Sequence, residues 1–284
     1  MVELVLPLYG LDDAPCRWYS KISGWLTDGI VNEGKAWTRS KLDPCLFHLR
    51  DDRGQLCGVL VVHVDDVLIA GEGPTFEQAV RRLKAKFPFR KWAVGEGEYC
   101  GSALAQDPKT YDITIKQTTP YQELKQVTVR RRVADSEAAT DAEIAGLRRL
   151  LGQGGWLCSQ TRPDTSVQVS QGQQVLPRPT VGQIRRTSAL ARRLQQHKDM
   201  TLRVRSIPPC DLCLIMHSDA SFLNAAKNGT QAGYILGFTN RDMARGEQSP
   251  WSPAAWRSYR LKRVVGSTLA GETQALSDGI GHLQ

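Results

Sequence analysis

Two adjacent aspartates, Asp65 and Asp66, interrupt a long apolar stretch, GVLVVHVDDVLIAG, at residues 58–71. Burying an unpaired carboxylate costs several kcal/mol or forces its protonation. A sequence that places two carboxylates in such a stretch therefore indicates a cation that neutralises them. Because hard divalent ions prefer oxygen ligands, the pair is a candidate site for Mg²⁺ or Mn²⁺.

The residues on both sides of the pair predict how it is presented. β-Branched residues favour strands at residues 59–64 and 67–70. Aspartate tolerates the dihedral angles of a tight turn, so the pattern predicts a hairpin with both carboxylates at its tip. The alternative is a plain aspartate-rich turn that points into water.

Neighbouring segments predict the elements that support this hairpin. A helix is predicted at residues 14–26, because Pro15 suits the first turn of a helix and large apolar residues follow at helical spacing. Residues 76–87 show the same pattern, with cations on the opposite face. Between these helices, strands are expected at residues 47–49 and 55–64, joined by the turn sequence DDRG.

The middle of the chain is basic and predicts helices. Amphipathic helices are expected at residues 141–160, weakened at the end by glycines, and at residues 181–197 after a breaker at residues 177–180. The chain has a net charge of +8, which favours a polyanionic partner such as nucleic acid, held through its phosphates. The alternative is that these cations are only solvated or ion-paired on the surfaces of helices. The candidate phosphate-binding residues are Arg130, Arg131, Arg132, Arg148, Arg149, Arg185, Arg186, Arg192 and Arg193.

The last third of the chain carries a second pair of candidate metal ligands. A short strand at residues 212–216 is expected to deliver Asp219 at its end, with a second strand at residues 231–237. A helix at residues 269–283 is expected to align Leu269, Leu276, Ile280 and Leu283 on its apolar face. Helical spacing puts Glu272 on that same face, so Asp219 and Glu272 are predicted to share a metal ion. An exposed helical glutamate is the alternative.

Composition narrows the class of protein. There is no run of 18 apolar residues, so no membrane span is expected, and the first residues lack the pattern of a signal peptide. Seven irregularly spaced cysteines indicate reduced thiols. Cys210 and Cys213 form a single CxxC, too little for a zinc site. We therefore expect an intracellular protein of the cytoplasm or nucleus that is not secreted.

Several short blocks occur in one order along nearly the whole chain. They are LYGLDDAPCRWY (8–19), LDPCLF (42–47), HVDDVLIAG (63–71), GEGEYCG (95–101), TRPD (161–164), HSDAS (217–221), WS (251–252) and STLAGETQAL (267–276). In this order they resemble the LYGLKQAPRAWY, DPSLF, YVDD, GELKYFLG, TRPD, SDADW, WSS and SSTEAEYIAL blocks of copia-type retrotransposon Pol polyproteins. Each block alone is a weak match, but the series is specific.

The resemblance implies an α+β fold in three parts. Residues 1–105 would form part of a reverse-transcriptase palm, an antiparallel sheet with helices. Residues 106–205 would form a basic helical region like the thumb and connection, and residues 206–284 an incomplete ribonuclease H-like α/β domain. The implied activity is RNA-directed DNA synthesis by two-metal phosphoryl transfer with removal of the RNA strand. The implied partners are an RNA and DNA template–primer duplex and deoxynucleoside triphosphates, without a membrane.

The resemblance also assigns roles to the four acids. Asp65 and Asp66 match the catalytic pair of the polymerase, and Asp219 and Glu272 match the first two acids of ribonuclease H. The third acid of each site would lie before Met1 or after Gln284, so we expect both sites to be incomplete. Whether the chain is an enzyme therefore stays open. The alternative is a catalytically inactive, retrotransposon-derived remnant that binds nucleic acid.

Overall fold

The structure is a computed structural model that describes residues 13–28, 36–117 and 119–282. The chain divides into two compact units, each described here by itself. The first unit runs to Val94 and includes Glu98–Gly101; the second comprises Gly95–Gly97 and Ser102–Gln284. Helices and several antiparallel sheets agree with the expected α+β class in its general form. The predicted division at residues 105 and 205 stays a prediction.

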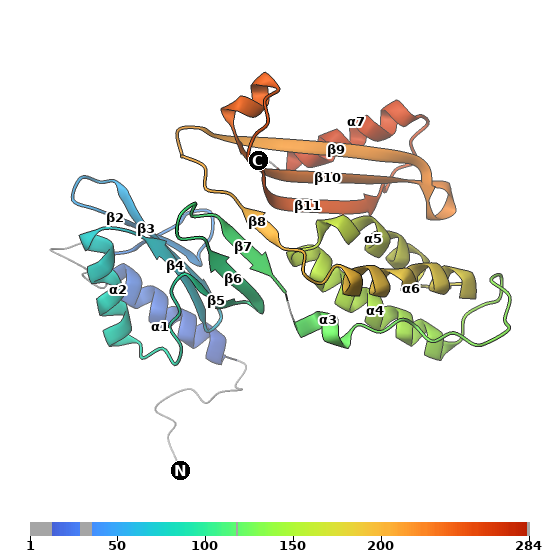
Figure 1. Cartoon of the computed structure of the whole chain (residues 1–284), viewed down its shortest axis with the longest axis horizontal. Helices are drawn as coiled ribbons and strands as arrows, with labels where there is room; N and C mark the ends of the chain where they lie inside the picture. Colours follow the sequence, from blue (N-terminus) through green and yellow to red (C-terminus); the bar gives the residue numbers. More distant parts are fainter. Residues whose placement is uncertain (1–12, 29–35, 118, 283–284) are drawn as a thin grey trace, which may run out of the picture. The chain divides into compact units, whose positions relative to one another are not determined.

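The first unit is a four-stranded sheet with two helices (Figure 1). The sheet has the order β1-β2-β3-β4, and each neighbouring pair is antiparallel. The predicted helices and strands are all confirmed, with small shifts in their ends. The elements are α1 (Ala14–Asp28), β1 (Thr38–Arg39), β2 (Leu46–Arg50), β3 (Leu56–His63), β4 (Asp66–Gly71) and α2 (Pro74–Lys86).

One face of this sheet forms the core of the first unit. Leu60 and Val62 of β3 are buried together with Ile22 and Leu26 of α1 and Leu83 of α2. Alternation along the strands sends the intervening residues to the other face. Among the described residues, the hairpin that carries the two aspartates is therefore anchored by a packed core on the face of Leu60 and Val62.

Glycine lets α2 approach the sheet closely. Gly71 pairs with Gly58 across β3 and β4, and the ring of Phe76 lies over both residues. A Cβ atom at Gly58 would lie 2.8 Å from Cδ2 of Phe76. Side chains at these two positions would push α2 away from the strand pair that ends in the acidic turn.

The second unit begins with a small sheet and continues into a helical region. The sheet has the order β5-β6-β7-β8, and the division between the units passes through β5. The elements are β5 (Glu96–Tyr99), β6 (Ser102–Gln106), β7 (Ile113–Lys116), α3 (Thr119–Glu123), α4 (Asp141–Gln160), η1 (Pro163–Thr165), α5 (Ser166–Val175), α6 (Val181–Gln196) and β8 (Leu202–Val204).

Capping boxes start the two long helices. Thr140 and Glu143 form one at α4, and Thr180 and Gln183 form the other at α6. Both predicted helices are confirmed, and α4 runs through its glycines to Gln160, while the weakening expected at its end stays a prediction. A Cβ atom at Gly154 would lie 2.9 Å from Cδ2 of Leu190, so the glycine permits close packing of α4 against α6.

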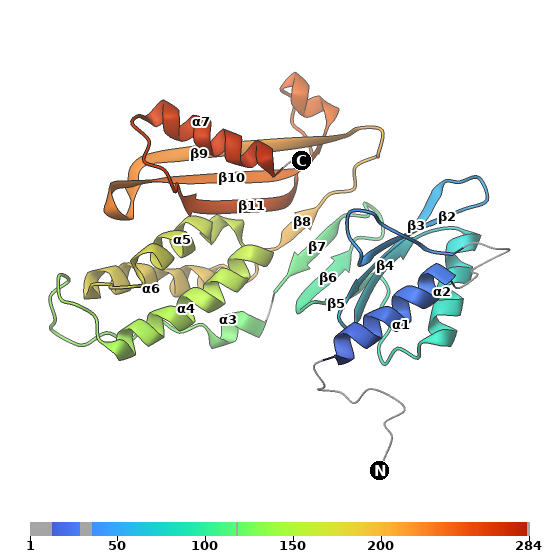
Figure 2. The ribbon, with the colours of Figure 1, turned by 180° about the vertical axis from the view of Figure 1, so that it is seen from behind.

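The last part of the second unit is a three-stranded antiparallel sheet with the order β11-β10-β9. Its elements are β9 (Leu212–Ala225), η2 (Ala226–Asn228), β10 (Gly229–Asn240), η3 (Arg241–Arg245), β11 (Ser252–Arg260) and α7 (Thr268–Gly281). Helices cover both faces. Gln231 of β10 bonds to Ser170 of α5, whereas Tyr234, on the alternate face, lies against Gly279 of α7 (Figure 2).

The predicted apolar face of α7 is wrong. Leu269, Leu276 and Ile280 are exposed, and Leu283 lies outside the described residues. The face that packs on the sheet consists of Gly271, Ala275 and Gly279. Helix and sheet approach so closely that a Cβ atom at Gly279 would collide with the sulfur of Met216. Because only small residues fit there, the larger apolar residues point outward.

Within the described ranges, no helix combines the length and the apolar character that crossing a membrane requires.

Candidate functional site

The two aspartates lie at the turn between β3 and β4. His63 pairs with Asp66, so Val64 and Asp65 make the turn and Asp66 is the first residue of β4. The turn thus begins one residue earlier than the predicted Asp-Asp turn. Val64 has a φ of 51°, in the left-handed region that a β-branched residue rarely adopts. Backbone strain of this kind costs about 1–3 kcal/mol and often occurs at functional sites.

Both carboxylates are exposed, as are His63 and Val64. The predicted hairpin with both carboxylates at its tip is confirmed, and its exposure also fits the alternative of an aspartate-rich turn that points into water. Exposure removes the desolvation penalty as a reason for a bound cation. A cation at this turn would have to be favoured by the two adjacent charges and by a further anionic ligand such as a phosphate.

A second turn holds one of the two carboxylates. The backbone N–H of Cys100, between β5 and β6, donates a 3.1 Å hydrogen bond to Oδ2 of Asp66. Cys100 has a φ of 50° and is followed by Gly101 with a φ of 74°. Burial, with Cys100 and Asp66 nearby, raises the pKa of Tyr99. The sequence revealed residues 95–101 only through their resemblance, and no local signal indicated this contact.

Strand register places the acidic tip relative to the core. Asp66 pairs with His63, and Leu68 pairs with Val61. These four residues lie on the face opposite Leu60 and Val62, because facing residues share a side and successive residues alternate. Asp66 therefore belongs to the less buried face of the sheet.

The donor set at this tip fits a divalent ion in part. Mg²⁺ is usually bound by one or two carboxylates together with water and substrate phosphates, which matches Asp65 and Asp66. The residues the structure describes contain no group of three His, Cys, Asp or Glu side chains suited to a metal. If an ion binds here, these two residues would hold it, and it would neutralise phosphoryl oxygens.

The second predicted pair of acids is not brought together. Asp219 pairs with Gly233 in the interior of β9, and not at the end of a strand as predicted. Its neighbour Ala220 faces α7, since the Cβ of Ala220 would lie 3.5 Å from a Cβ at Gly271. Alternation puts Asp219 on the opposite face, away from the helix that carries Glu272. The pair does not fit a shared metal ion in this arrangement.

The structure separates the nine candidate arginines into two groups. Three form ion pairs: Arg130 with Glu143, Arg185 with Asp135, and Arg193 with Asp164. These ion pairs connect different segments of the second unit, so the three arginines have structural roles. The other six are exposed and stay candidates for phosphate binding: Arg131, Arg132, Arg148, Arg149, Arg186 and Arg192.

Sequence reasoning missed the structural role of the TRPD segment. The side chain of Arg162 is 1% exposed and makes a bidentate pair with Asp164, with distances of 2.8 and 2.9 Å. It also donates to the hydroxyl of Tyr121 in α3 and to the carbonyl of His197 at the end of α6. One buried guanidinium thus joins three helices, η1, α3 and α6. The only signal in the sequence was the spacing of Arg162 and Asp164, two residues apart, which does not reveal burial.

Comparisons with known proteins give one match of interest. No family model matches the chain. The chain is 25% identical, over 292 aligned positions, to the "Retrovirus-related Pol polyprotein from transposon RE1" of Arabidopsis thaliana. The alignment covers 98% of this chain but only 18% of that polyprotein. This similarity relates the chain to a retrotransposon Pol polyprotein.

Proposed function

We propose that the chain is a piece of a copia-type reverse transcriptase in which Asp65 and Asp66 bind a divalent ion for phosphoryl transfer on nucleic acid. The observation that carries this proposal is the exposed β3–β4 turn, with two adjacent carboxylates and a strained Val64. The general relation to a retrotransposon Pol polyprotein supports it. The activity of the family would be RNA-directed DNA synthesis.

The residues around the turn have distinct parts in this proposal. Asp65 and Asp66 would hold Mg²⁺ or Mn²⁺, whose charge would stabilise the phosphoryl oxygens of a primer end or nucleotide. The N–H of Cys100 binds Oδ2 of Asp66, so Oδ1 would be the oxygen that holds the ion. Arg131, Arg132, Arg148, Arg149, Arg186 and Arg192 would bind phosphates of a template–primer duplex of RNA and DNA.

Salt dependence tests the phosphate contacts. Binding of a template–primer duplex should weaken steeply as salt rises, with a log–log slope that reports the number of phosphates contacted. Arg192→Gln should reduce the magnitude of that slope by about one. Arg185→Gln, in the same helix but paired with Asp135, is the matched control and should change the slope less. Affinity that is indifferent to salt would contradict binding through phosphates.

A second candidate is favoured by the separation of Asp219 from Glu272. In it the chain binds nucleic acid but catalyses nothing, as a retrotransposon-derived remnant. Because the described residues gather only two carboxylates at the turn, we expect no primer extension by this chain alone with Mg²⁺ or Mn²⁺. Extension that is lost in Asp65→Asn but kept in Glu72→Gln would exclude the remnant.

Metal-dependent binding separates the two candidates when extension is absent. If the turn binds an ion beside a nucleic-acid end, Mn²⁺ should tighten the binding of a template–primer to the wild-type chain. The Asp65→Asn, Asp66→Asn double variant should lose this effect while Glu72→Gln keeps it. An equal effect of Mn²⁺ on all three proteins would refute the proposed role of the turn and favour the remnant.

A further inference from the structure

The outer strand of the last sheet has an open edge. Residues 212–221 of β9 form ten consecutive pairs with β10. In the part of the chain that the structure describes, no strand pairs with the other edge of β9, which lies away from α5 (Figures 1 and 2). Such an edge presents a row of backbone N–H and C=O groups that another strand can match.

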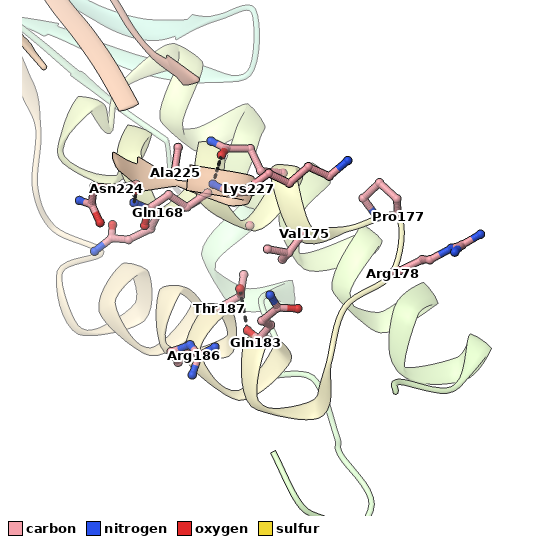
Figure 3. Close-up of a pocket in the computed structure, with 14 residues that line it drawn as sticks. Gln168, Val175, Pro177, Arg178, Gln183, Arg186, Thr187, Asn224, Ala225 and Lys227 are labelled. Atoms are coloured by element: carbon pink, nitrogen blue, oxygen red, sulfur yellow. Dashed lines mark hydrogen bonds between the residues drawn. The ribbon is translucent and has the colours of Figure 1, made fainter. Parts of the chain in front are cut away.

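The open edge ends where the chain turns toward α5. Leu223 has a φ of 57°, outside the range of a strand. The carbonyl of Asn224 accepts a hydrogen bond from Gln171 of α5, and the N–H of Ala226 donates to Gln174 of the same helix (Figure 3). The connection between β9 and β10 is thus held against α5, which leaves the straight part of β9 open to a partner.

This edge lacks the residues that usually keep exposed strands apart. Residues 212–221 contain no lysine, arginine or proline, and Asp219 is their only charged side chain at neutral pH. α7, which packs on the same strand, contains two acids, Glu272 and Asp278, and no basic residue. In a chain with 37 lysines and arginines, an edge without cations suits a protein partner better than a polyanion.

One side of α7 presents large apolar residues above this edge. Asp278 accepts a hydrogen bond from the hydroxyl of Tyr259 in β11, so its side of the helix faces away from β9. Two residues span slightly more than half a helical turn, which puts Leu276 and Ile280 on the side toward β9. Leu269 belongs to the same stripe, and all three are exposed.

The position of α7 determines what a strand added to β9 would meet. A Cβ atom at Gly271 would lie 3.5 Å from Ala220 of β9 and 3.3 Å from Thr230 of β10, so the helix lies over the gap between these strands. The helix axis is therefore half a strand spacing from β9, and a twofold axis between two paired β9 strands lies another half spacing beyond. With strands about 4.8 Å apart, two α7 helices would lie about 10 Å apart, a usual distance between packed helices.

We propose that the edge of β9 binds a second copy of the chain. The two β9 strands pair antiparallel, the two three-stranded sheets become one, and the two α7 helices lie side by side. Both copies use the same surface, so both open edges are consumed and association stops at the dimer. Strand pairing alone is marginal in water, and burial of the apolar stripes of both helices supplies the further stabilisation.

The contacts of α7 also select the register. The helix contacts Ala220 near its first turn and Met216 near its last, so its middle lies over Ser218. The two helices overlap most when the twofold axis passes through Ser218, which sets His217 of each copy opposite Asp219 of the other. Both side chains are exposed, and an imidazole N–H donates to a carboxylate, whereas an axis through Asp219 would bring two carboxylates together.

The same register matches the apolar stripes of the two helices. With the twofold axis over the middle of α7, Leu276 of one copy lies near Leu276 of the other. Leu269, near the start of one helix, lies near Ile280, close to the end of its antiparallel neighbour. The side chains that are exposed in one chain are therefore buried between two.

This interaction goes beyond the proposed function and is independent of it. Its residues belong to the second unit, whereas Asp65 and Asp66 belong to the first. The Asp65→Asn, Asp66→Asn double variant should dimerise as the wild type does. Failure to dimerise would leave the response of the β3–β4 turn to Mn²⁺ untouched, so failure of one proposal is distinguishable from failure of the other.

Sedimentation velocity of the full chain, from about 1 to about 100 µM, tests the proposal. We expect the mass to rise from the 31.5 kDa of one chain to twice that value and to stop there. Growth into larger species would overturn the twofold pairing. A chain that is monomeric throughout would overturn the proposal and leave this edge to a strand of another protein.

Helix variants connect the dimer to the apolar stripe. The Leu276→Glu, Ile280→Glu double variant should weaken dimerisation at least about tenfold, because it brings like charges together between the two helices. Leu42→Glu, at another exposed leucine that belongs to the first unit, is the matched control and should dimerise as the wild type does. Equal dimerisation of both variants would overturn the proposal.

A charge exchange tests the register. His217→Asp should weaken dimerisation about tenfold, because it puts a carboxylate opposite Asp219 of the other copy. Adding Asp219→His should restore it, since each carboxylate again faces an imidazole. A dimer that is unaffected by the first change, or not recovered by the second, would overturn the proposed pairing.

A measurement on the wild-type chain covers variants that fail to fold. Hydrogen exchange of backbone amides should slow in residues 212–221 and in α7 as the concentration of the chain rises. Protection that increases only in other segments would overturn the proposal.

Discussion

The buried ion pair of the TRPD segment makes a sharp prediction about stability. In Asp164→Asn the guanidinium of Arg162, whose side chain is 1% exposed, stays charged but loses the compensating charge and one of the two acceptors that lie at 2.8 and 2.9 Å. Removing one partner of a buried pair costs about 3–5 kcal/mol, because the other charge remains desolvated. For a unit of this size the melting temperature should fall by roughly 10 °C or more.

The pH dependence of this variant gives a second readout. Burial by itself would raise the pKa of Asp164, but the hydrogen bonds and charge of Arg162 outweigh it and hold the pKa below its ordinary value. Such a carboxylate stabilises the fold above its unfolded pKa, and the stabilisation is lost as pH falls through the folded pKa. The difference between wild type and variant should therefore shrink on acidification.

Urea denaturation followed by circular dichroism measures this loss. Asp242→Asn, which breaks the exposed pair with Arg245, is the control and should cost less than about 1 kcal/mol. The double variant Arg162→Met, Asp164→Leu should recover much of the stability, since it removes both charges. A loss below about 1 kcal/mol in Asp164→Asn would refute the view that this pair joins the three helices.

Two further predictions concern the cap of α4 and the strained turn. Hydrogen bonds from the backbone of Arg130 and Thr140 lower the pKa of Glu143 to about 2. Glu143→Gln should therefore destabilise the protein by about 2 kcal/mol at neutral pH, and the difference should vanish as pH falls from about 4.5 toward 2; a difference constant over this range in urea titrations would contradict the assignment. Val64→Asn should stabilise the chain by about 1 kcal/mol, because asparagine tolerates positive φ; a loss of stability in the same assay would show that Val64 is not strained.

The sequence predicted the elements whose residues have a clear period. Strands and helices around Asp65 were predicted within a few residues, because β-branched runs and helical apolar stripes determine local structure directly. The acidic tip of the hairpin was also predicted, but the sequence left open whether its carboxylates bind a cation or simply point into water. The contact between Cys100 and Asp66 depends on tertiary structure and leaves no pattern in a single sequence.

The apolar face of α7 shows a different failure. Periodicity assigned Leu269, Leu276 and Ile280 to the core. In the structure Gly271, Ala275 and Gly279 pack on the sheet instead, because α7 lies too close to it for larger side chains. Large apolar residues at helical spacing lie on one face of a helix, but the spacing does not show that this face is the one that packs on the sheet. Likewise, the sequence offered Asp219 and Glu272 as partners, but strand alternation places them on opposite sides of one sheet.

Paramagnetic broadening of backbone amide signals by Mn²⁺ tests the central proposal most directly. In a ¹⁵N-labelled chain, the amides of Val64, Asp65, Asp66 and Cys100 should broaden at the lowest Mn²⁺ concentrations. The Asp65→Asn, Asp66→Asn double variant should lose this effect. Broadening that begins at other exposed acids, or that persists unchanged in the double variant, would contradict a divalent-ion site at the β3–β4 turn.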